Sequence, residues 1–229
     1  MRMPSRGIYS VRRILREIFL WPVIHLRVQR LVRAKPTATS GALRIVDVNW
    51  DPTDDEGFTQ AVLNALDLIQ RHDPNRRRRI EREIRFIVNA ELVSWGMYGR
   101  TGRVCSIDYG RFPLDRANEH YQWYLARFAC LLIHESTHGY LYSRRVPYTR
   151  RTRSRVERIC HREERRFAAR LPTDRYNFGR DLVPEFDLSR WESHWSSSLL
   201  TRIKILSRRI EESERRAGQR GRSDEGVPA

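Results

Sequence analysis

The chain has 229 residues, enough to bury a full hydrophobic core in one domain with extensions at both ends. Its formal net charge is +16, and only two of its 44 basic residues are lysines, so arginine carries almost all of the positive charge. A surface this basic favours anionic partners such as nucleic acid, membrane headgroups or acidic protein, without selecting among them. The charge therefore excludes no function class by itself.

The cysteines, Cys105, Cys130 and Cys160, are odd in number and widely spaced. They form neither a disulfide framework nor a paired-cysteine metal motif, which points to a reducing cytoplasm. The favoured role of all three is that of small buried hydrophobic residues. Thiolate ligation is the alternative for Cys130, one turn before a histidine motif, and for Cys160 on a later predicted helix.

The first 41 residues are predicted to form a basic amphipathic helix and a linker. Between residues 8 and 33, apolar side chains recur at helical spacing among arginines, and Pro22 should break or kink the helix. The uninterrupted apolar core, Ile18 to Ile24, is too short to span a bilayer, and a secretory cleavage site is lacking. The helix is expected either to lie on an anionic membrane surface or to pack on the domain or a partner. Residues 34–41 are predicted to be the linker.

Residues 42–187 are predicted to form an α+β domain that is predominantly helical, with a small sheet. An arginine run at 76–79 is expected to be solvated at a helix start or turn. The other predicted elements are a strand at 43–48, a helix through 58–69, a short helix and a strand within 80–93, a glycine-rich loop or hairpin turn at 95–102, a strand at 104–109 and a long helix at 114–142.

The motif His134-Glu135-Ser136-Thr137-His138 lies in the long helix. Residues four apart on a helix project from one face, so both imidazoles can bind one ion. Glu135 can then reach a water in the open coordination site and act as general base. The surrounding residues are apolar, and polar groups desolvated on such a helix need a partner, which a zinc ion supplies. Core histidines bonded to backbone or carboxylates are the alternative.

A catalytic zinc site needs a third protein ligand. The metzincin spacing would place a histidine soon after the motif, and residues 139–144 do not supply it. A helix predicted at 152–171 instead carries three polar residues along its apolar side: Glu157, His161 and Glu164.

The expected reversal of the chain through Pro147 and Tyr148 ranks these three residues. Glu157 then returns level with His138, and Glu164 lies about 10 Å further along the helix. Glu157 is therefore favoured as the third ligand, with Glu164 second. His161 stays open as a ligand, as a supporting group or, with Tyr148, as a candidate donor to the oxyanion of the transition state.

The two histidines and Glu135, with Glu157 on the following helix, resemble the gluzincin class of zinc metallopeptidases. Residues 163–172, Glu-Glu-Arg-Arg-Phe-Ala-Ala-Arg-Leu-Pro, are similar to the E-x-x-F-A-x-x-L-x-P run of small cytoplasmic bacterial metallopeptidases of the ImmA/IrrE type. The resemblance covers about residues 125–172. It implies a zincin-like fold in which His134 and His138 bind zinc and Glu135 activates water.

Two further expectations come from the resemblance. Zincins have an edge strand that lines the cleft beside the motif helix and pairs with extended substrate, and the strand at 104–109 is the natural candidate here. The acidic-ligand register usual in ImmA/IrrE-type proteins falls on His161, where this sequence departs from that pattern.

The C-terminal part completes the prediction. Residues 188–212 have the periodicity of an amphipathic helix, and residues 213–229 are predicted to be disordered. The sequence as a whole predicts a cytoplasmic zinc metallopeptidase that acts on protein or peptide and binds the membrane peripherally if residues 8–33 anchor it. The alternative is a basic nucleic-acid-binding or membrane-surface regulatory protein with a structural or vestigial metal site.

Overall fold

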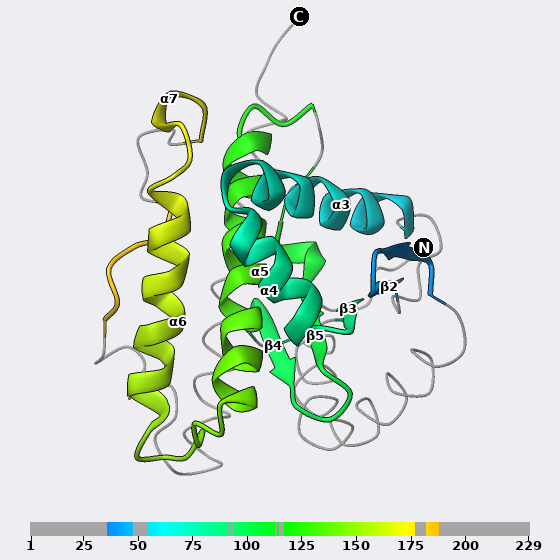
Figure 1. The fold of residues 1–229 in the computed structure, drawn as a ribbon. Helices are drawn as coiled ribbons and strands as arrows, with labels where there is room; N and C mark the ends of the chain where they lie inside the picture. The colour runs from blue at the N-terminus through cyan, green and yellow to red at the C-terminus, as the bar shows by residue number, and fades with distance from the viewer. Residues whose placement is uncertain are drawn as a thin grey trace, which may run out of the picture. The chain divides into compact units, whose positions relative to one another are not determined.

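The computed structural model describes residues 36–47, 55–90, 92, 94–112, 114, 117–176 and 182–187. This part of the chain is α+β, with a helical majority among its regular elements and one small sheet (Figure 1). The amphipathic helices predicted at 8–33 and 188–212, and the tail at 213–229, lie outside the described residues. No helix within the described ranges combines the length and the hydrophobicity that a membrane span requires.

The strands of the described part form one mixed sheet. The inner three strands are parallel, and an antiparallel strand flanks them at each end. Their order across the sheet is β1 (Ala38–Ser40), β2 (Leu43–Asp47), β3 (Phe86–Asn89), β5 (Val104–Ile107) and β4 (Gly96–Gly99). Residues 38–40, expected to belong to a linker, therefore form a strand. A two-residue turn joins it to β2, and Gly41 adopts the positive φ of +60° that such hairpin turns require.

Helix α5 is the element against which most of the others pack. It contacts α3, α4, α6 and α7 as well as strands β4 and β5, and α6 runs alongside it in Figure 1. The fully buried rings of Phe58, Phe128 and Phe167 come from three of these helices and fill the core. The helices of the described residues are α3 (Asp55–His72), α4 (Pro74–Glu83), α5 (Tyr121–Ser143), α6 (Arg153–Ala168) and the short α7 (Thr173–Tyr176), together with the 3-10 turn η2 (Tyr109–Arg111).

Two sequence predictions need correction. The long helix begins at Tyr121 instead of Leu114, with His120 as its N-cap. Asn118 forms a turn before it, in which its side-chain oxygen accepts a hydrogen bond from the backbone N–H of His120 and its carbonyl accepts one from the N–H of Tyr121. The strand expected at the edge, Val104–Ile107, is an inner strand between β3 and β4. The edge strand beside α5 is β4, within the glycine-rich segment that was predicted to be a loop or hairpin turn.

The arginine run at 76–79 was expected to be solvated, but Arg76 and Arg79 form ion pairs with residues of the folded domain. Arg76 is buried, where its guanidinium pairs with Asp73 and with Glu163 of α6, the latter at 3.0 Å. Arg79 and Arg166 bond the same Glu163 carboxylate at 3.1 and 2.8 Å. One buried carboxylate thus ties α6 to α4. Burial raises the pKa of Glu163, but the hydrogen bonds from Arg166 and Arg79 outweigh it and hold the pKa below its usual range.

We predict that Glu163→Ala lowers the free energy of unfolding by about 3 kcal/mol, because it leaves the buried Arg76 without one of its charged partners. Since the folded-state pKa of Glu163 is depressed, its stabilising effect is complete above the unfolded pKa and disappears as the pH falls through the folded pKa. Urea unfolding at pH 7 and at pH 3 measures both effects. The exposed Glu185→Ala is the control; an equal loss for both variants, or a loss from Glu163→Ala that does not shrink at pH 3, would contradict the prediction.

Candidate metal centre

His134 and His138 project from one face of α5 toward α6, as their spacing of four predicts. Their Nε2 atoms lie 3.1 Å apart, and their ring centroids are separated by 4.9 Å. Both side chains are largely withdrawn from solvent, with 11% and 16% of their surface exposed. Two buried ring nitrogens that face each other at this distance share a site for one proton or one cation.

Glu157 of α6 completes the convergence. Its Oε2 lies 3.2 Å from Nε2 of His134, and its Oε1 lies 3.5 Å from Nε2 of His138. Two ligand atoms on a tetrahedral zinc ion with bonds of 2.0–2.1 Å are separated by about 3.3 Å. The two ring nitrogens lie 3.1 Å apart, and each lies 3.2 or 3.5 Å from a different oxygen of Glu157, so the three side chains are close enough together to share one cation.

One buried oxygen of Glu157 lacks a hydrogen bond in the described part of the chain, which is consistent with a cation bound between the three side chains. Oε2 of Glu157 is buried and makes no hydrogen bond among the described residues, although Nε2 of His134 lies 3.2 Å away. Leaving a buried carboxylate oxygen without a well-aligned partner is costly, and metal coordination removes that cost. The other oxygen, Oε1, accepts a hydrogen bond of 2.5 Å from the hydroxyl of Tyr148.

The charges around the two histidines favour a cation. Burial lowers the pKa of His134, but Glu164 and Glu157 outweigh it and raise the pKa well above its usual value. Burial also lowers the pKa of His138, while Cys160 and Glu157 raise it, with a net result of about 10. In turn, burial raises the pKa of Glu157, but its attraction to the two histidines outweighs burial and holds the pKa well below its usual value. The same field attracts a proton or a metal ion.

The three candidates on α6 occupy different places. Glu157 faces both Nε2 atoms. Glu164 accepts a hydrogen bond from Nδ1–H of His134, which leaves Nε2 as the atom with the free lone pair. His161 is half-buried and packs edge-on against Phe186, with a centroid distance of 5.5 Å. The geometry therefore gives Glu157 the place of a ligand and Glu164 that of an orienting group, and it leaves His161 outside the cluster.

Glu135 is buried against the edge strand. A Cβ atom on Gly96 of β4 would lie 3.0 Å from Oε1 of Glu135 and 2.9 Å from a methyl carbon of Leu131, so a larger residue there would force these side chains to move. Burial raises the pKa of the Glu135 carboxyl; His134 and His138 lower it, and Glu157 and Glu164 raise it again, with a net upward shift. A carboxylate moved in this direction is a stronger base than one in water.

The sequence favoured a packing role for Cys160 with thiolate ligation as the alternative, and the structure places its sulfur beside the two histidines of the candidate metal centre. A nitrogen of each histidine and the sulfur of Cys160 all lie within 4.8 Å of one another. The signal in the sequence was the spacing of Glu157, Cys160 and Glu164 by three and four, which puts all three on one helical face.

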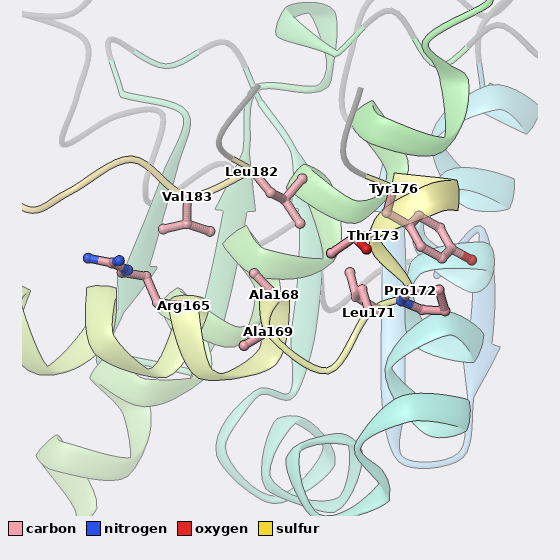
Figure 2. Close-up of a pocket in the computed structure, with 9 residues that line it drawn as sticks. All are labelled: Arg165, Ala168, Ala169, Leu171, Pro172, Thr173, Tyr176, Leu182 and Val183. Carbon is pink, nitrogen blue, oxygen red and sulfur yellow. The ribbon is translucent and has the colours of Figure 1, made fainter. Parts of the chain in front are cut away.

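A separate pocket at the other end of α6 contains none of these residues (Figure 2). It is lined mainly by apolar side chains, including Leu171, Leu182 and Val183.

We predict that Glu164→Gln lowers zinc affinity by about 10- to 100-fold, because the amide accepts the His134 proton less strongly than a carboxylate does. Competition against a chromophoric chelator measures the affinity. Glu185→Gln, the same change at an exposed position of the described chain, should leave it unaltered. Equal affinities for the two variants would show that Glu164 does not orient the histidine.

No protein-family model, no curated protein and no solved structure matches this chain. The candidate centre therefore rests on the geometry of its own residues: His134, His138 and Glu157 are candidate ligands, Glu164 contacts Nδ1 of His134, and Glu135 lies on the same helix as the two histidines.

Proposed function

We propose that the protein is a zinc-dependent metallopeptidase with a zincin-like domain, of the gluzincin type that the sequence resembles. The observation that supports this function is the convergence of two imidazole nitrogens and one carboxylate at 3.1–3.5 Å, with Glu135 adjacent on the same helix. A closed structural site would not require a buried glutamate of raised pKa beside it. The buried, free cysteines favour a location in the reducing cytoplasm.

The residues divide the work as follows. His134, His138 and Glu157 hold the ion, and Glu164 and Tyr148 orient two of these ligands through hydrogen bonds. Zinc bound in such a site lowers the pKa of water to about 7 and polarises a carbonyl oxygen.

Glu135 moves the proton in this mechanism. Its carboxylate accepts a proton as the water oxygen bonds to the peptide carbon, and it returns that proton to the amine nitrogen as the C–N bond breaks. Burial raises its pKa, which suits both halves of this transfer near neutral pH. Because the carboxylate lies against Gly96, the reaction takes place beside strand β4.

Strand β4 gives the substrate a docking edge. It is the last strand of the described sheet and pairs with β5 on one side only. An extended peptide that pairs with the other side would run past Glu135, with affinity from main-chain hydrogen bonds. This supports peptide as the substrate class.

We predict that Glu135→Gln lowers the rate of peptide hydrolysis by about 10²- to 10⁴-fold while zinc content stays unchanged, because the amide cannot accept the proton of the water. The rate is measured on a quenched fluorescent peptide library, and zinc by elemental analysis of the purified protein. Gln122→Glu, an isosteric change near the start of the same helix, is the control. A Glu135→Gln rate equal to wild type, or purified wild type without zinc, would refute the proposed function.

A second candidate function is binding of a nucleic acid. The ring of Tyr140 lies within 5.1–6.0 Å of the guanidinium groups of Arg79, Arg82 and Arg144. Nearby along α5, the half-exposed Tyr142 carries Arg100 at 5.0 Å from its ring. Arginines combined with aromatic rings are the usual surface for single strands. The possible membrane anchor at residues 8–33 lies outside the described residues.

We predict that, if this surface binds nucleic acid, Arg144→Ala weakens binding of a single-stranded DNA oligonucleotide severalfold and makes the dependence on salt less steep, since one phosphate contact is lost. Fluorescence anisotropy across a salt series measures both quantities. Arg175→Ala, which removes an arginine stacked on Tyr176 in another helix, is the matched control. Binding that does not respond to salt would remove this candidate.

A further inference from the structure

Cys160 is buried differently from the other two cysteines. All three are fully buried, and Cys105 and Cys130 belong to the main hydrophobic cluster of the described residues. Cys160 is absent from that cluster and lies on α6 one turn after Glu157. Its sulfur is instead grouped with a ring nitrogen of each motif histidine, and the three atoms all lie within 4.8 Å of one another.

The chemistry of these neighbours suits a thiolate ligand. Zinc binds cysteine sulfur at about 2.3 Å and histidine nitrogen at about 2.0–2.1 Å, which places the two ligand atoms about 3.6 Å apart in a tetrahedral site. That separation lies within the 4.8 Å span of the observed group. The buried Oε2 of Glu157, which makes no hydrogen bond, is a second sign that this cluster binds a cation.

We propose that the Cys160 thiolate is a fourth ligand of the metal held by His134, His138 and Glu157, and that it keeps the site closed at rest. This inference rests on the proposed metal site and adds regulation to it. Structural zinc sites fill all four positions with protein ligands, whereas catalytic sites leave one for water. While the sulfur is bound, the water that Glu135 would deprotonate has no place. Detachment of the sulfur leaves the three-ligand site that the proposed hydrolysis requires.

Two variants separate the ligand from a packing residue. Cys160→Ala removes the sulfur and should retain the metal through the remaining three ligands, with affinity at least about tenfold lower, since loss of an outer orienting group alone costs that much. Cys130→Ala makes the same change at an equally buried position of α5 that belongs to the hydrophobic cluster. It should leave metal affinity unaltered.

The deciding experiment is absorption spectroscopy of the full chain loaded with Co²⁺ in place of zinc. The wild type and Cys160→Ala should both show the visible bands of a protein-bound cobalt ion, but only the wild type and Cys130→Ala should show the sulfur-to-cobalt charge-transfer band in the near ultraviolet. Peptide hydrolysis by zinc-loaded Cys160→Ala should rise severalfold over wild type, because its site is permanently open.

Three other spectra would each refute one part of the proposal. Wild type with visible cobalt bands but no charge-transfer band shows that Cys160 is not a ligand, while the three-ligand site remains. A charge-transfer band that survives in Cys160→Ala assigns the sulfur to another cysteine and refutes the proposal. Wild type without any cobalt bands refutes the metal site itself, and the proposed function with it. These readings of the wild-type spectrum hold even if a variant fails to fold.

Discussion

The structure depends on one costly arrangement: His134, its largely buried neighbour His138, and the buried carboxylates of Glu157 and Glu164 meet between α5 and α6. Polar groups withdrawn from water must find partners, and breaking a buried charged pair typically costs 3–5 kcal/mol. The partners here come from the opposite helix. His134 is bonded at Nδ1 by Glu164 and approached at Nε2 by Glu157, so the two helices can satisfy these groups in one register only. Hydrogen bonds and ion pairs therefore hold the two helices together, in addition to apolar contacts.

That register is fixed a second time on the far side of α6. Glu163, the neighbour of Glu164, points to α4, where Arg76 and Arg79 bond its carboxylate. Consecutive residues on a helix differ in direction by about 100°, so adjacent glutamates can serve two different helices. Rotation of α6 that would pull Glu157 away from the histidines would also break the arginine cluster. The arginine richness of the chain thus has a structural use at this point, separate from any anionic partner.

Sequence patterns predicted the part of the site whose residues lie close together in the chain, on α5 and α6. The spacing of His134 and His138 implies one helical face, and the short reversal before α6 brought Glu157 level with them in the prediction. The edge strand and Arg76 could not be predicted in this way. Which strand lies at the edge depends on the order of strands across the sheet, and the burial of Arg76 depends on Glu163, 87 residues away. For Cys160 the sequence favoured packing over thiolate ligation, because free cysteine is usually a core residue.

Two glycines, Gly96 and Gly139, lie where strand β4 packs closely against helix α5. A Cβ on Gly139 of α5 would lie 3.1 Å from the ring of Tyr98 and 2.9 Å from Cβ of Glu83, while one on Gly96 would meet Leu131 and Glu135. Helix and edge strand therefore approach each other through two bare backbone positions, one on each element. A side chain at either position would meet atoms at about 3 Å, so its neighbours would have to shift to make room. Because Glu135 lies at this contact, the close packing that buries its carboxylate also brings the four-residue edge strand β4 next to it, which is the arrangement that the proposed docking of a peptide on β4 needs.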